Sequence, residues 1–177
     1  MRILLSADDV QAGVGRLAGD ISRHYGDQPL TVLGVMTGSI VLMADLIRQL
    51  SMPLQVGVVQ ASSYKTGTER GELRLNEDFL PDIRRRNVLL VDDIFDTGHT
   101  LAAMTELLRR QQPASLRTAV LLSKQGRQAV NFVPDHVVFG IPDMFVVGYG
   151  LDYRDRFREL PHVAVLEPDD VADGATS

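Results

Sequence analysis

The sequence predicts an α/β fold in which a mainly parallel, twisted sheet is flanked by helices on both faces. Short apolar runs of strand length alternate along the chain with segments whose apolar residues recur every three or four positions, as in an amphipathic helix. The 177 residues, 45% of them hydrophobic and none of them Cys, are about the length of one domain. We therefore expect a single domain, 1–177, with a core that needs no disulfide.

The charge balance and the apolar runs exclude several classes of protein. Eighteen Lys and Arg against 23 Asp and Glu give a net charge of -5. A general nucleic-acid binder instead neutralises phosphates with a basic face. No run approaches the roughly 18 apolar residues of a membrane span, and the first aliphatic run is too short for a signal peptide. Since a chain without Cys is typical of a reducing compartment, we expect a cytoplasmic protein without nucleic-acid or membrane partners.

The first helix is expected between Ser6 and Gly26. Ser6 and Asp9 have the spacing of a capping box, and Gly26 supplies a stop. The apolar residues that recur at helical spacing are Val10, Val14, Leu17 and Ile21. Residues 13–18 match a G-x-G-x-x-A dinucleotide fingerprint, but they follow a polar segment rather than a strand and lack the later acid. We interpret these glycines as helix-packing positions.

The next elements form a strand, a glycine turn and a helix. Residues 30–35 (LTVLGV) are a strand-length apolar run, 36–39 (MTGS) a tight turn, and 40–50 a helix with one apolar face. A second strand is expected at 54–59. The polar segment 62–76 contains two glycines and little apolar content, so we expect a loop that is too long for a hairpin turn.

The second half continues the alternation. Residues 88–91 (VLLV) are a buried strand that runs directly into two acids, and the helix after it carries apolar residues on one side. The remaining strands are expected at 117–124, 136–141, 145–150 and 162–167. The acidic end, 168–177, is expected to be a disordered tail. Arginines 84–86, 154 and 156 are expected to be solvated.

Three carboxylates lie close together where the strand at 88–91 ends. Asp92, Asp93 and Asp96 would repel one another unless cations or hydroxyl donors lie among them. Residues 96–100 (DTGHT) open a helix, and free amides, two hydroxyls and a glycine at a helix N-terminus suit a phosphate. Because parallel sheets bind ligands beyond the carboxyl ends of their strands, we predict a ribose-phosphate site here. An Asp-capped helix with no ligand is the alternative.

This segment, VLLVDDIFDTGHT, resembles the signature of the type I phosphoribosyltransferases. The rest of the chain is similar to their hypoxanthine-guanine branch: MTGSIVLMADL resembles its diphosphate loop, ASSYKTGTERGEL its mobile loop, and IPDMFVVGYGLDYRDRFRELPHV its purine-binding hood. The resemblance implies the type I fold, with a small hood built mainly from about 134–166 together with N-terminal residues. It also implies purine salvage: transfer of the 5-phosphoribosyl group from 5-phosphoribosyl 1-diphosphate to N9 of hypoxanthine or guanine, giving IMP or GMP and diphosphate.

The resemblance further implies roles for the acidic segment. Asp96 is the expected catalytic base at N7 of the purine. Asp92 and Asp93 are expected at the ribose hydroxyls. The candidate ligands of Mg²⁺, which arrives with the diphosphate, are Asp92, Asp93 and Asp152. The 5-phosphate is expected on the turn formed by Thr97, Gly98, His99 and Thr100, with no catalytic role for His99.

Other residues are expected at the diphosphate and the base. The diphosphate contacts are expected from Thr37, Gly38 and Arg158, and from Ser63 and Tyr64 of the mobile loop. The purine contacts are expected from Lys124, Phe145, Val146 and Asp152. Lys124 would donate to O6 and Phe145 would stack on the base. Without the resemblance, the sequence alone would predict that Lys124 is a solvated surface charge and that Phe145 is a core residue of a strand.

Two other functions are compatible with this fold. One is an RNA-binding regulator, which the net charge of -5 and the purine-type hood disfavour. The other is a nucleotide sensor without chemistry, which Asp96 and the complete mobile loop disfavour. Relatives in the branch commonly form homodimers or homotetramers. Two positions depart from the branch: Asp92 replaces a common Glu, and Thr37 replaces a Lys found in some members, which leaves backbone amides to bind the diphosphate.

Overall fold

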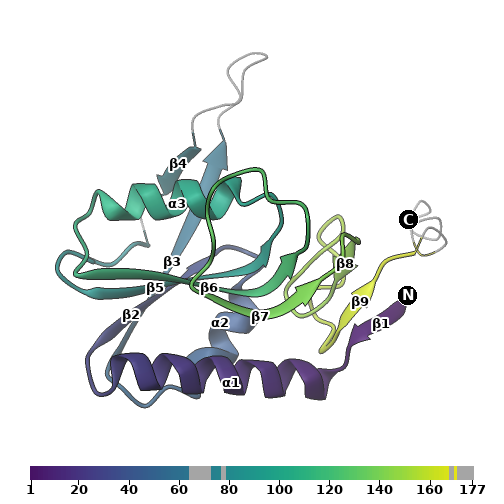
Figure 1. Ribbon diagram of the computed structural model, residues 1–177, viewed down its shortest axis with the longest axis horizontal. Helices are drawn as coiled ribbons and strands as arrows, with labels where there is room; N and C mark the ends of the chain where they lie inside the picture. The colour runs from purple at the N-terminus through teal and green to yellow at the C-terminus, as the bar shows by residue number, and fades with distance from the viewer. Residues whose placement is uncertain (64–72, 77–78, 168–169, 171–177) are drawn as a thin grey trace.

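The computed structural model describes residues 1–63, 73–76, 79–167 and 170. Its centre is a six-stranded sheet, whose arrangement Figure 1 shows. The strand order is β4-β3-β2-β5-β6-β7. The five strands that run parallel are β3 (Leu54–Ser63), β2 (Leu30–Val35), β5 (Asn87–Phe95), β6 (Ser115–Lys124) and β7 (His136–Ile141). β4 (Leu73–Asn76) pairs antiparallel with β3 at one edge. The predicted α/β fold with a mainly parallel sheet is confirmed.

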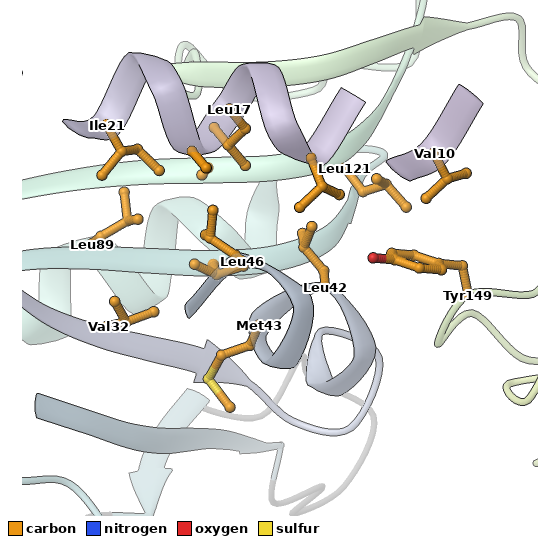
Figure 2. Close-up of a cluster of buried hydrophobic side chains, with 14 of the residues drawn as sticks. Val10, Leu17, Ile21, Val32, Leu42, Met43, Leu46, Leu89, Leu121 and Tyr149 are labelled. Atoms are coloured by element: carbon orange, nitrogen blue, oxygen red, sulfur yellow. The ribbon is translucent and has the colours of Figure 1, made fainter. Parts of the chain in front are cut away.

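Helices cover both faces of this sheet. α1 (Ala7–Tyr25) and α2 (Ile40–Ile47) pack on one face and α3 (His99–Arg109) on the other (Figure 1). Successive residues of the central strand β5 alternate between the two cores: Leu89 and Val91 face α1 and α2, whereas Val88 and Leu90 face α3. Figure 2 shows the first core, where Leu89 lies among side chains from both helices. A strand buried on both faces explains the continuous apolar run VLLV.

The first helix has the predicted boundaries. Ser6 Oγ accepts a hydrogen bond from the backbone N–H of Asp9 at 3.1 Å, the Asp9 carboxylate accepts one from the backbone N–H of Ser6 at 3.0 Å, and Gly26 is the C-cap. A Cβ on Gly13 would lie 2.5 Å from the ring of Phe139 in β7. Gly13 therefore serves close packing of helix on strand, in agreement with our interpretation, whereas a Cβ on Gly15 would only reach the side chain of Gln49 at 3.5 Å.

A second, three-stranded sheet forms the hood region. It has the order β1-β9-β8, with β1 (Arg2–Leu5), β9 (Val163–Val165) and β8 (Val146–Val147) all antiparallel. The N-terminal strand β1 thus pairs with β9 from the C-terminal part of the chain, although β1 was not among the predicted strands. The range 134–166 also includes β7, which pairs with β6 in the main sheet.

Several predicted elements differ in length. Strand 145–150 is reduced to Val146–Val147 because Gly148, Tyr149 and Gly150 have positive φ angles of 94°, 51° and 98°, which turn the chain out of a strand. The helix predicted at 40–50 ends at Ile47. The segment 62–76 is not wholly a loop, since β3 extends to Ser63 and β4 returns along it. Backbone pairing of this kind leaves little trace in composition.

Some of the predictions for the chain ends and for the arginines expected to be solvated can be compared with the structure. Tyr64 and the rest of 64–72 lie outside the described residues, as does the predicted tail apart from Asp170, whose carboxylate contacts the N-terminal ammonium of Met1 at 2.7 Å. Arg154 and Arg156 are exposed as expected, but Arg86 is partly buried and donates to Thr31 Oγ1 at 2.9 Å. Within the described residues, no helix is long and apolar enough to cross a membrane.

Candidate active site

The predicted site residues gather at the carboxyl end of the parallel strands. The turn after β2 (36–39), the turn after β5 (96–98) and the last residue of β6, Lys124, lie at this edge of the sheet. One detail differs from expectation. β5 continues through Phe95, so Asp92 and Asp93 lie within a strand paired with β6 rather than beyond its end.

The acidic pair on β5 is held in an unfavourable environment. Asp92 is 7% exposed and Asp93 is partly buried. The backbone N–H of Asp93 donates to Asp92 Oδ1 at 3.0 Å, and that of Ile94 donates to Asp93 Oδ1 at 2.7 Å. Burial raises the pKa of Asp92 well above its usual value, and the neighbouring charge of Asp93 raises it further. Two adjacent carboxyl groups with few donors favour a ligand that brings cations or hydroxyls.

We expect Asp92→Asn to stabilise the protein in metal-free, ligand-free buffer by about 1 kcal/mol, which corresponds to an increase in Tm of roughly 2–4 °C. Because the folded state holds the Asp92 proton more tightly than the unfolded chain, wild-type stability falls as pH rises from the usual Asp pKa through the raised pKa of Asp92. The stabilisation should therefore be present at neutral pH and vanish in acid. Melting curves of both proteins from about pH 4 to pH 8 test this, and equal curves at every pH would contradict it.

The acidic pair borders a cavity of about 360 Å³ that includes most of the predicted phosphate turn. Its lining residues are Val35, Asp92, Asp93, Ile94, Phe95, Asp96, Thr97, Gly98, Thr100 and Leu101. Gly98 has a φ of 85°, and a Cβ there would lie 2.7 Å from Val130 and 2.8 Å from Phe95. His99, the first residue of α3, is exposed and is not among the lining residues. The helix therefore begins at the wall of a cavity, with its first amides available to an anion.

The turn at 36–39 is packed between the acidic pair and the hood. A Cβ on Gly38 would lie 1.8 Å from Asp93 Oδ2, and one on Gly150 would lie 2.1 Å from the carbonyl oxygen of Gly38. Ser39 Oγ donates to the carbonyl oxygen of Val35 at 2.7 Å. Thr37 is exposed at the tip of this turn, and the Met36–Thr37 peptide bond is cis. Only residues without a Cβ allow the three segments to approach this closely.

Arg158 lies at the same end of the site. Its Nη1 donates to the carbonyl oxygen of Gly150 at 2.8 Å, and its Nη2 lies 2.9 Å from Asp152 Oδ1. Its positive charge also acts on Asp93, where it opposes the increase in pKa caused by burial. The predicted diphosphate residues Gly38 and Arg158 are thus joined through Gly150. Ser63 ends β3, and Tyr64 lies outside the described residues.

A second cavity, of about 200 Å³, contains the predicted purine residues. It is lined by Asp93, Ile94, Asp96, Lys124, Phe145, Val146, Leu151 and Asp152. Lys124 is only 8% exposed, which overturns its interpretation as a solvated surface lysine. Phe145 is 51% exposed and packs edge to face against Tyr153, with ring centroids 5.6 Å apart. One face of this aromatic ring is therefore available to a flat ligand.

Asp96 belongs to both cavities and is contacted by two cations. Its Oδ1 accepts from Arg127 Nε at 3.0 Å and its Oδ2 lies 3.4 Å from Lys124 Nζ. Burial raises the pKa of Asp96, but hydrogen bonds and positive charge from Arg127 and Lys124 outweigh it, so the net pKa is lowered. Asp96 is therefore a carboxylate at neutral pH. Arg127 was not predicted from the sequence, and neither was Asp143, which contacts both cations. The only signal for them was their closeness in sequence to Lys124 and Phe145.

The site combines a glycine turn at a helix N-terminus, an acidic pair on β5 and a cavity with an exposed aromatic ring. These features define the class: an α/β protein that binds a sugar phosphate together with a flat base. Comparison with known proteins agrees. The model of the phosphoribosyl transferase domain family matches residues 4–154. The hypoxanthine-guanine phosphoribosyltransferase of Staphylococcus epidermidis is 40% identical over 166 residues, 93% of each chain. The hypoxanthine phosphoribosyltransferase of Haemophilus influenzae is 40% identical over 171 residues, 93% of this chain and 96% of its own.

Solved structures show the same likeness. A hypoxanthine-guanine phosphoribosyltransferase from Bacillus anthracis superposes with a TM-score of 0.88 at 35% identity, covering 94% of this chain and 99% of that one. A single-residue variant of the hypoxanthine phosphoribosyltransferase of Trypanosoma cruzi, in complex with the product IMP, superposes with a TM-score of 0.89 at 35% identity, covering 100% of this chain and 95% of that one. The chain belongs to the phosphoribosyltransferase family, in its hypoxanthine-guanine branch, which confirms the resemblance seen in the sequence.

Proposed function

We propose that this protein is a purine-salvage enzyme that transfers the 5-phosphoribosyl group from 5-phosphoribosyl 1-diphosphate to N9 of hypoxanthine or guanine and releases diphosphate. The observation that carries the proposal is the junction of the two cavities. Asp93, Ile94 and Asp96 line both of them. A ribose phosphate in the first cavity and a base in the second would therefore meet beside Asp96. The cytoplasm is the proposed location.

The roles of the residues follow from this placement. Asp96, ionised at neutral pH, accepts the proton at purine N7 while N9 attacks C1 of the ribose. Lys124 donates to O6, and Phe145 stacks on the base while the Val146 backbone meets its edge. Asp92 and Asp93 accept hydrogen bonds from the ribose hydroxyls. The amides and hydroxyls at Thr97, Gly98 and Thr100 hold the 5-phosphate, and the His99 contribution is limited to its backbone.

The donor set fits Mg²⁺ that binds together with the diphosphate. Within the described part of the chain, no group of three or more His, Cys, Asp or Glu side chains could hold a metal ion. Carboxylate oxygens of Asp92, Asp93 and Asp152 are nevertheless the hard ligands that Mg²⁺ prefers, and this ion is usually bound by one or two carboxylates plus substrate phosphates. When bound, Mg²⁺ neutralises charge on the leaving diphosphate. Thr37, Gly38 and Arg158 would contact the same group.

A spectrophotometric assay of the purified protein tests the proposal directly. We expect turnover of hypoxanthine, guanine or both when the sugar diphosphate and Mg²⁺ are present, and none when either is omitted. Absence of turnover with both bases would overturn it. This chain is also proposed to form a homodimer or a homotetramer, as relatives in the branch commonly do. Light scattering after size exclusion would measure the mass of the assembly.

Replacing Lys124 with Met should raise KM for hypoxanthine and guanine at least tenfold, because a charge-assisted hydrogen bond to O6, worth about 1.5–3 kcal/mol, is lost. Met keeps the apolar stem, so packing changes little. The KM of the sugar diphosphate serves as an internal control and should change much less, since Lys124 does not line the ribose-phosphate cavity. Adenine should be a very poor substrate of the wild type, because its C6 amine cannot accept a hydrogen bond from Lys124. Unchanged hypoxanthine kinetics in the variant would remove Lys124 from the base-binding site.

A further inference from the structure

Four charged side chains form a closed ring beside the purine cavity. Lys124 Nζ lies 3.4 Å from Asp96 Oδ2 and 3.7 Å from Asp143 Oδ1. Arg127 Nε lies 3.0 Å from Asp96 Oδ1, and its Nη1 lies 3.6 Å from Asp143 Oδ2. Each cation thus contacts both carboxylates. The two cations nevertheless bind different oxygens of Asp96.

Lys124 cannot serve Asp96 and the base equally well. Its ammonium is nearly buried and lines the purine cavity, whereas Arg127 is not among the lining residues. When Lys124 donates to O6, its contact with Asp96, already at the long end of the hydrogen-bond range, weakens further. Arg127 makes the shorter contact with Asp96, and because it does not line the purine cavity, the base does not compete for it. A planar guanidinium also fixes the plane of a carboxylate better than an ammonium does.

We propose that Arg127 is a positioning residue that holds Asp96 through Oδ1, so that Oδ2 faces purine N7 while Lys124 binds the base. Asp143 lies 3.6 Å from a different nitrogen of the same guanidinium, Nη1, and so helps to keep Arg127 directed at Asp96. This inference rests on the proposed function, because it assigns Arg127 to the same reaction. It goes beyond the roles argued above in dividing the two cations between the base and the carboxylate.

The ionisation of Asp96 gives a readout that a merely structural role would not change. The charged groups around this carboxylate are Lys124 and Arg127, with Asp143 behind them and with Asp93 and Asp152 elsewhere along the purine cavity. Burial raises the pKa of Asp96, and the hydrogen bond from Arg127 is the largest of the effects that lower it. Loss of Arg127 should therefore move this pKa upward.

The test compares Arg127→Gln with Arg127→Lys and with Arg84→Gln. Arg84 is an exposed arginine that bonds Gln112 away from the site, so its variant controls for loss of one surface charge. We expect Arg127→Gln to lower kcat about tenfold or more, with KM for the sugar diphosphate little changed and with the acidic limb of the kcat profile shifted to higher pH. Arg127→Lys, which keeps the charge but not the planar fork, should recover part of kcat and most of the pH profile.

Carbon-detected NMR titration of the Asp side chains in the ligand-free protein, with Asp96 assigned from Asp96→Asn, measures the same effect without turnover. An upward shift of the Asp96 pKa in Arg127→Gln together with the loss of kcat supports the proposal. Wild-type kcat, an unmoved Asp96 titration, or a loss of activity that only follows a loss of Tm would overturn it. If the wild type does not turn over either base, the proposed function fails, while the NMR titration still decides whether Arg127 controls Asp96.

Discussion

Replacing Asp96 with Asn should lower kcat for hypoxanthine by about a hundredfold or more and leave the fold intact. Asn keeps the size of the side chain and its capacity to accept a hydrogen bond, but it cannot take a proton from the purine. Arg127 and Lys124 retain Asp143 as a partner, so the substitution does not strand two unpaired cations. Because Asp96 acts in the chemical step, KM for both substrates should change far less than kcat.

The matched control is Asp20→Asn, the same chemical change on the solvent side of α1, where Asp20 pairs with Arg23. This variant should have wild-type kcat. Steady-state kinetics and melting curves of both variants provide the comparison. If Asp96→Asn loses Tm in proportion to its activity, Asp96 is a helix-capping carboxylate rather than the base.

Replacing Gly38 with Ala should lower kcat/KM for the sugar diphosphate by about a hundredfold, because the added methyl would lie 1.8 Å from Asp93 Oδ2 and must displace it. The displaced atom is the end of a side chain, so we expect a modest loss of Tm. The functional loss should be large, since Asp93 lines both cavities and the turn at 36–39 is also in contact with Gly150. Kinetics with the donor varied at saturating hypoxanthine measure the effect.

Gly19→Ala is the control for this variant. Gly19 lies inside α1, and a Cβ there would meet nothing within 4 Å. Alanine in that position should stabilise the helix by roughly 0.5–1 kcal/mol and leave kinetics unchanged. Wild-type donor kinetics in Gly38→Ala would show that the turn and Asp93 can separate without cost to binding.

Local patterns were sufficient to predict most of the main sheet and its helices. The boundaries of α1 follow from a capping box and a terminal glycine, both of which involve residues within a few positions of one another. The apolar run before Asp92 indicates a strand buried on both faces, and the helix that follows Gly98 begins at the predicted turn. Such features depend on neighbouring residues and on the period of the hydrophobic pattern, so they can be predicted from the sequence without knowledge of the tertiary structure.

Tertiary structure alone decided which strands pair in the second sheet and which charges surround Asp96. β1 is a short strand whose partner, β9, lies about 160 residues further along the sequence, and no local pattern predicts that pairing. Arg127 and Asp143 belong to no motif. They meet Asp96 and Lys124 only because the parallel strands β6 and β7, which they follow, end at the same edge of the sheet. Local sequence determines which side chains carry charge, whereas the distances that set their pKa values depend on how distant segments pack.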